Sequence, residues 1–200
     1  MRILLIQLGR LGDVLLGTPA IRSLREAIPA AEIDFLTRPA FAPILEVNPS
    51  LDRVRRYTPR RTEAALLREA FGPDRYDVVV DFQSTPHSAI LARLTRAPMR
   101  IGWDKRYRIG YTHRLRQSGE HVYAAAHKVE LLRPLGVAVG SLRLELPVSA
   151  ADREHAAALW ERLGWPVDAP AAALSPVSRR SYKRWPLDRF AAVGDALSRR

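Results

Sequence analysis

MRILLIQLGRLGDVLLGTPAIRSLR, residues 1–25, is the stretch that decides the fold predicted for this chain. Residues 2–7 are almost wholly apolar and rich in branched side chains, which predicts a strand buried on both faces at the centre of a parallel sheet. A turn with two glycines follows at residues 8–13, and apolar residues then recur at helical spacing as far as Leu24. A strand, a glycine turn and a helix open a Rossmann-like half, in which ligands bind where strands end and helices begin.

Length and composition fit a globular protein with a proper core. The 200 residues suffice for one large domain, or for one domain and part of another. The hydrophobic content is 47%, and without cysteine neither a disulfide framework nor a thiolate metal site is expected. The first apolar run is too short for a secretion signal, and no stretch reaches the roughly 18 apolar residues of a membrane helix. We therefore expect a soluble, cytoplasmic protein.

The chain is strongly basic. It has 32 Lys and Arg residues against 21 Asp and Glu residues, a formal net charge of +11. The positive electrostatic potential of such a chain favours the binding of polyanions, including nucleic acid, a phosphorylated glycolipid or an anionic membrane surface. The alternative is that frequent arginine and alanine reflect only the composition of the genome.

Strands and helices alternate along the rest of the first 164 residues, as in an α/β fold with a parallel sheet. Further strands are expected at residues 32–37, 52–57, 76–82 and 99–102, and helices at residues 41–46, 62–71, 86–94, 121–133 and 150–164. Pro19 predicts either a kink in the first helix or a restart with Thr18 as N-cap. Residues 103–119 are basic and aromatic without a clear period, which predicts a loop across the binding face.

A domain boundary is expected near residue 165. Residues 165–170, with two prolines, have the composition of a linker. Residues 171–175 then predict a new strand and residues 186–197 a helix, the first βα unit of a second Rossmann-like domain. Residues 171–200 fall far short of the roughly 100 residues of a complete domain, so we expect an N-terminal domain at 1–164 and an incomplete second one.

Two loops carry candidate chemistry. Gly9 and Gly12 allow a tight turn and close approach to a ligand, although their spacing is not that of a dinucleotide-binding or phosphate-loop motif. Asp13, in the first helical turn, is either a favourable partner of the helix dipole or a general base. Residues 175–186 place hydroxyls, cations and a helix start together, which suits either a phosphate site or a solvated basic loop.

Two basic clusters have both a functional and an ordinary interpretation. Arginines follow the strand at 52–57 and could grip an acidic acceptor, or they could be surface residues: Arg55, Arg56, Arg60 and Arg61. Cations alternate with aromatic residues between residues 100 and 111, as on nucleic-acid or sugar-binding surfaces: Arg100, Trp103, Lys105, Arg106, Tyr107, Arg108 and Tyr111. The five histidines show no metal-ligand spacing, so we expect no metal site.

Four stretches together resemble the heptosyltransferases of lipopolysaccharide core assembly, glycosyltransferase family nine. They are Gly12 to Ala20, Ala31 to Leu36, Tyr76 to Gln83 and Lys183-Arg184-Trp185-Pro186. The resemblance extends over essentially the whole chain. It implies a GT-B architecture of two Rossmann-like domains, with the acceptor mainly on the N-terminal domain and the nucleotide sugar on the C-terminal one.

The resemblance also implies an activity and residue roles. Members of this family move heptose from ADP-heptose to an inner-core sugar with inversion and without a required metal; no cofactor is expected. Asp13 would deprotonate the acceptor hydroxyl, while Lys183 with Ser178 and Ser181 would hold the donor diphosphate. Acceptor contacts would come from Gly12, Arg60 and Arg61. The positive charge would suit peripheral contact with the anionic inner membrane at its cytoplasmic face, and no specific nucleic acid is expected as partner.

Two departures from the family pattern affect these expectations. The turn before Asp13 has Gly9-Arg10 where many relatives have two serines. The donor motif with glycine and histidine, late in the family's second domain, is absent from these 200 residues, so we expect a partial enzyme.

Two rival functions would share some of these features. A nicotinamide-dependent oxidoreductase would share the Rossmann half, but the glycine spacing differs and Thr37-Arg38 supplies no ribose-binding acid. A non-catalytic polyanion-binding protein would explain the charge and the cluster between residues 100 and 111, and would bind nucleic acid with steep salt dependence.

Overall fold

The computed structural model describes residues 1–58, 75–105, 110–117, 122–165, 170–178 and 180–199. The chain divides into two compact units, Met1–Ser149 and Ala150–Arg200. The predicted helix at 62–71 lies outside the described residues.

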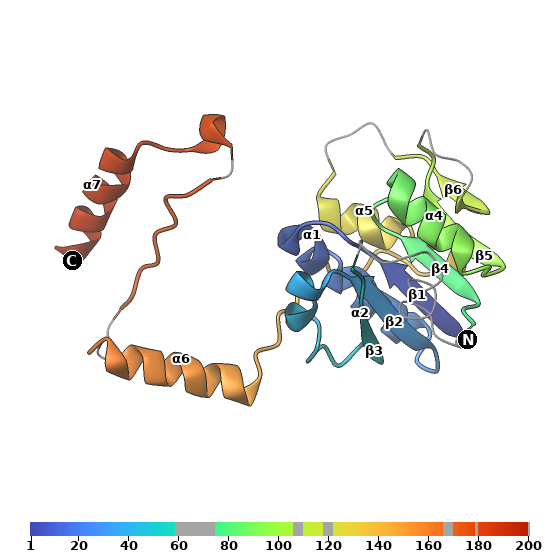
Figure 1. Ribbon diagram of the computed structural model, residues 1–200, viewed down its shortest axis with the longest axis horizontal. Coiled ribbons are helices and arrows are strands. Elements are labelled where there is room, and N and C mark those ends of the chain that lie inside the picture. Colours follow the sequence, from blue (N-terminus) through green and yellow to red (C-terminus); the bar gives the residue numbers. More distant parts are fainter. Residues whose placement is uncertain (59–74, 106–109, 118–121, 166–169, 179, 200) are drawn as a thin grey trace. The chain divides into compact units, whose positions relative to one another are not determined.

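The first unit is built on a six-stranded parallel sheet of Rossmann-like order, β3-β2-β1-β4-β5-β6 (Figure 1). Its strands are β1 (Arg2–Ile6), β2 (Glu32–Thr37), β3 (Arg53–Arg56), β4 (Val78–Asp81), β5 (Met99–Trp103) and β6 (His113–Leu115). The first strand lies between β2 and β4, and its residues 3–6 are fully buried. This confirms the central strand predicted from residues 2–7.

Helices cover both faces of the sheet because successive side chains of a strand point to opposite faces. On one face Ile3 and Leu5 pack with α2 (Thr18–Ala27) and α5 (Ala124–Glu130). On the other face Leu4 and Ile6 pack with α4 (Pro86–Leu94). Among the described residues of this unit, the other helical segments are α1 (Leu11–Leu15) and two 3-10 turns, η1 (Pro39–Ile44) and η3 (Arg133–Leu135).

The first helix restarts at the proline. The α1 helix ends at Leu15, and Pro19 lies in the first turn of α2. The expected N-cap is wrong by one residue, because Gly17 holds that position and the Thr18 hydroxyl donates instead to the Leu15 carbonyl at 2.8 Å. The break therefore leaves α1 as a short helix that begins directly after the glycine turn and carries Asp13 in its first turn.

The basic, aromatic segment 103–119 is not simply a loop, because it contains β6. Trp103 and Tyr111 are buried, so neither offers a ring to nucleic-acid bases. A Cβ at Gly102 would lie 2.6 Å from the Tyr111 ring, which shows that the missing side chain makes room for that ring against β5. The polyanion-binding interpretation thereby loses two of its aromatic contacts.

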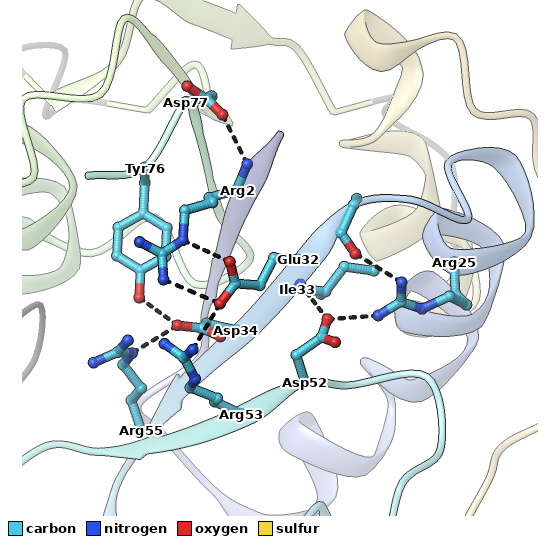
Figure 2. Close-up of polar contacts among 11 residues, drawn as sticks. Arg2, Arg25, Glu32, Ile33, Asp34, Asp52, Arg53, Arg55, Tyr76 and Asp77 are labelled. Carbon is cyan, nitrogen blue, oxygen red and sulfur yellow. Dashed lines mark hydrogen bonds and ion pairs between the residues drawn. The ribbon is translucent and has the colours of Figure 1, made fainter. Parts of the chain in front are cut away.

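A network of ion pairs joins the amino ends of the strands (Figure 2). The Arg2 backbone N–H donates to Asp77 at 2.7 Å, and the Arg2 guanidinium pairs with Glu32 at 2.8 Å. Arg53 contacts the same Glu32 at 2.9 Å. These residues begin β1, β2 and β3 or precede β4, so the network ties four strands together at the edge opposite their carboxyl ends.

Two of the arginines considered for acceptor binding have structural partners. The Arg55 Nε lies 2.7 Å from the buried Asp34 carboxylate, which also accepts from the Tyr76 hydroxyl at 2.6 Å (Figure 2). Arg56 forms an ion pair with Glu46. Arg55 therefore links β2 with β3 inside the sheet.

The second unit contains α6 (Ala150–Arg162), the 3-10 turn η4 (Ser181–Lys183) and α7 (Leu187–Ser198). The helix predicted at 186–197 is confirmed as α7. The strand predicted at 171–175 is wrong: these residues are exposed and belong to no strand. A strand needs a hydrogen-bonded neighbour, and the described part of this unit contains no other strand.

The helix α6 has no buried residue, and it belongs to the second compact unit. The sequence prediction placed it before a boundary at 165. No helix among the described residues is long and apolar enough to cross a membrane.

Candidate functional site at the carboxyl edge of the sheet

The β1–α1 turn is held by two glutamines at the carboxyl ends of adjacent strands. Ile6 pairs in register with Asp81, so the segments that follow β1 and β4 lie side by side. The Leu8 N–H donates to the Gln83 side-chain oxygen at 2.9 Å, and the Gln7 side-chain amide donates to the Gly9 carbonyl at 3.1 Å. A Cβ at Gly9 would lie 3.3 Å from the Gln83 amide nitrogen. The turn is therefore tightly packed, which explains its glycine.

Arg10 gives this turn an unusual backbone. It has φ 50° and ψ 126° immediately before α1, in the region that non-glycine residues rarely adopt. Strained residues of this kind cluster at functional sites. The pair Gly9-Arg10, noted as a departure from the family pattern, therefore includes the strained position.

Asp13 lies in the first turn of α1 and is half-buried. No side chain caps this helix, and among the described residues no hydrogen bond holds the Asp13 carboxylate. A carboxylate at the ligand edge of a parallel sheet, with its oxygens available, can accept a proton from a bound hydroxyl. Gly12 precedes it, and a Cβ added at Gly12 would meet nothing within 4 Å, so the surface beside Asp13 is open.

A buried lysine lies next to these residues. Lys128, from α5, donates to the Gln7 side-chain oxygen at 2.7 Å, and its Nζ lies 5.1 Å from the centre of the Phe82 ring. Burial lowers the pKa of Lys128 to about 8, although attraction to Asp13 and Asp81 opposes the shift. The only sequence signal for this residue was its place on the apolar stripe of the predicted helix, between Ala125 and Leu132.

Asp81 holds the turn between β4 and α4 by accepting hydrogen bonds. It is fully buried, and burial raises its pKa against the effect of its hydrogen bonds. The Tyr111 hydroxyl donates to it at 2.6 Å, and the backbone N–H groups of Gln83 and Ser84 donate at 3.0 Å. Burial and the adjacent Asp81 raise the pKa of Tyr111. Asp81 therefore positions the β4–α4 turn.

At the same carboxyl edge of the sheet, Tyr57, which follows β3, contacts His87 at the start of α4. The Tyr57 hydroxyl lies 2.5 Å from the His87 Nε2, and His87 lies exposed in the first turn of α4. Burial raises the pKa of Tyr57, while the charge of Arg38 opposes the shift. The expected acceptor residues Arg60 and Arg61 lie outside the described residues.

The predicted donor-phosphate residues all lie in the second unit. Ser178 lines a pocket of about 510 Å³ with Pro176, Arg184, Trp185 and Leu187. The Arg184 guanidinium donates to the Ser178 carbonyl at 2.9 Å. Ser181 and Lys183 lie in η4, and neither lines this pocket. The segment thus brings a hydroxyl and a guanidinium together, and the phosphate site remains a prediction.

The sheet order and the turns at its carboxyl edge define the first unit as a Rossmann-like domain of the GT-B type. The chain belongs to glycosyltransferase family 9, the heptosyltransferases, whose family model matches residues 65–200.

Relatives and solved structures agree with this assignment. The chain is 28% identical to Lipopolysaccharide heptosyltransferase 3 of Escherichia coli, over 94% of this chain and 58% of that protein. It is also 28% identical to Lipopolysaccharide heptosyltransferase 1 of Escherichia coli K12, over 93% of this chain and 61% of that protein. The chain therefore spans about three fifths of the length of these relatives.

Among solved structures, a family 9 glycosyl transferase from Veillonella parvula matches with a TM-score of 0.88 at 26% identity, over 99% of this chain and 59% of that one. The E. coli heptosyltransferase WaaC with ADP-2-deoxy-2-fluoro heptose matches with a TM-score of 0.73 at 25% identity, over 98% of this chain and 65% of that one.

Proposed function

We propose that this chain is part of an inverting glycosyltransferase that moves heptose from ADP-heptose to an inner-core sugar of lipopolysaccharide. The observation that carries the proposal is the Asp13 carboxylate, half-buried at the ligand edge of the sheet in a heptosyltransferase-family chain. The names of the relatives, and the nucleotide-heptose analogue bound to WaaC, support this choice of donor and acceptor.

In the proposed reaction, Asp13 removes the proton from the acceptor hydroxyl. The freed oxygen attacks the anomeric carbon of heptose from the face opposite the diphosphate. A new C–O bond forms, the bond to the diphosphate breaks, and ADP leaves with that electron pair. Cations and hydroxyls near the leaving diphosphate would stabilise its growing charge; we assign this role to Ser178, Ser181 and Lys183.

The two domains expected from the sequence would divide the substrates between them. We propose that residues 1–164 bind the acceptor, with contacts from Gly12, Arg60 and Arg61, and that residues 171–200 begin the domain that binds the nucleotide sugar. The net charge of +11 would favour a cytoplasmic enzyme in peripheral contact with anionic inner-membrane lipid.

The decisive experiment is heptose transfer from ADP-heptose to lipopolysaccharide inner-core acceptor by the protein that carries this chain. Asp13→Asn should lower kcat by about 10²- to 10⁴-fold, the usual contribution of a general base. Glu26→Gln, an exposed carboxylate on α2, is the matched control and should leave kcat unchanged. Wild-type transfer by Asp13→Asn would remove Asp13 from its role, and no transfer by the wild type would reject the function.

A further inference from the structure

The charged side chain of Lys128 is buried where an apolar residue would ordinarily lie. It is 7% exposed and comes from α5, whose residues Ala125 and Val129 are buried in the core. Burying an ammonium group is unfavourable by several kcal/mol unless hydrogen bonds and opposite charges compensate it. Fold stability alone therefore does not account for a lysine here.

The groups that face Lys128 come from three elements or their adjoining turns. Gln7, after β1, accepts its hydrogen bond, and Phe82, after β4, offers the face of its ring. The charged groups are Asp13 from α1 and Asp81 from β4, both of which interact electrostatically with the ammonium. Next to Lys128 on α5, the His127 ring lies against Trp103.

The two carboxylates differ in what else holds them. Asp81 accepts three hydrogen bonds, from Tyr111 and from the Gln83 and Ser84 backbones, and it has no solvent exposure. Asp13 is half-buried, and its carboxylate has no hydrogen bond among the described residues. Removing Lys128 would leave Asp81 anchored, whereas Asp13 would lose an electrostatic attraction that no hydrogen bond among the described residues replaces.

Resting on the proposed function, we propose that Lys128 is a positioning residue for the base Asp13. Its ammonium is fixed by Gln7, whose side-chain amide also holds the Gly9 carbonyl of the β1–α1 turn, and so it keeps the Asp13 carboxylate in place until the acceptor hydroxyl arrives. During transfer the hydroxyl proton moves to Asp13, and Lys128 keeps its own proton throughout. Asp13 returns its proton to solvent after ADP and the product leave.

A first test needs no catalysis and uses the 200-residue chain. With ¹³C-labelled lysine, NMR follows the titration of Lys128, identified by its loss in Lys128→Met. Asp13→Asn should move the Lys128 midpoint to lower pH, because a negative charge that favours the ammonium is lost. The control Glu26→Gln should leave the midpoint in place. An unchanged midpoint in Asp13→Asn, in a chain with wild-type chemical shifts elsewhere, would overturn the inference.

The second test measures transfer by the protein that carries this chain. Lys128→Met should lower kcat at least tenfold with less than a twofold change in KM. Lys128→Arg should restore most of kcat. A merely structural lysine would leave kcat of the folded Lys128→Met variant near the wild-type value, and that result would reject the positioning role.

The two proposals fail in distinguishable ways. Wild-type activity in Asp13→Asn would reject the base itself, whatever Lys128→Met does. Loss of activity in Asp13→Asn together with a wild-type kcat in Lys128→Met would leave the base and reject only the role of Lys128.

Discussion

Replacing Lys128 by methionine should change how the stability of the first unit depends on pH. The folded-state pKa of Lys128, about 8, lies below its ordinary value of 10.5, so the unfolded chain holds this proton more tightly. The stability that the neutral lysine contributes is fully present above pH 10.5. It is lost as the pH falls through about 8, because the buried amine must then be charged. Methionine cannot titrate and lacks this dependence.

The magnitude follows from the two pKa values. At about 1.4 kcal/mol for each pH unit, the fall from 10.5 to about 8 corresponds to about 3 kcal/mol, and the 7% exposure of Lys128 leaves little solvent screening. Methionine also leaves the buried Gln7 oxygen without its donor, at a cost of about 1–3 kcal/mol. That cost is the same at every pH, so it cancels when the two pH values are compared.

The assay is guanidinium unfolding at pH 7 and pH 10.5, at 25 °C. Trp103, buried in the first unit, is the fluorescent reporter in a background in which the other three tryptophans, Trp160, Trp165 and Trp185, are phenylalanine. Relative to Lys128→Met, the lysine protein should gain about 3 kcal/mol between pH 7 and pH 10.5. The exposed Lys105→Met is the matched control and should show no such difference. Equal differences at both pH values would refute the argument.

Two further substitutions test the packing of the sheet. Asp34→Ala should lower the free energy of unfolding by about 3 kcal/mol, because it removes a buried carboxylate that pairs with an arginine at 2.7 Å. The control Glu26→Ala breaks an exposed pair at 3.8 Å and should change the free energy of unfolding by less than about 0.5 kcal/mol. An equal loss in both would contradict a special role for the buried pair. Gly102→Ala should lower the free energy of unfolding by about 1–3 kcal/mol, since the added methyl would lie 2.6 Å from the Tyr111 ring. The control Gly12→Ala has no atom within 4 Å of its new methyl and should not destabilise the first unit. Denaturant unfolding of the first unit measures all four variants. An unchanged free energy of unfolding in Gly102→Ala would disprove the close packing.

Several elements were predictable because their signals are local. Residues 2–7 contain no polar side chain between Ile3 and Ile6, which marks a central strand before any partner is known. The Thr85-Pro86 pair predicted the start of α4, and the structure adds a capping box in which Thr85 and Ser88 satisfy each other's backbone N–H groups. Asp13 could be placed near the ligand edge for the same reason, since it follows such a strand by one glycine turn.

Other predictions were wrong where an element depends on a partner. The segment 103–119 was expected to be a loop because β6 has only three residues and no alternating pattern; it becomes a strand by pairing with β5. Residues 171–175 are apolar enough for a strand but have no neighbour among the described residues of their unit. A strand's hydrogen bonds lie between segments, so neither outcome could be decided from one segment alone.

The order of residues along the chain thus determines a Rossmann-like half, its central strand and the turn that presents Asp13. The surroundings of Asp13 arise only when distant segments pack together. Lys128 meets Gln7 across 121 residues, and Tyr111 meets Asp81 across 30. Local periodicity specifies which face of a helix is buried, but strand order and helix packing specify what that face meets. A lysine on an apolar stripe is therefore an anomaly in the sequence, and in the folded domain it is hydrogen-bonded to Gln7, which holds the turn before the proposed base.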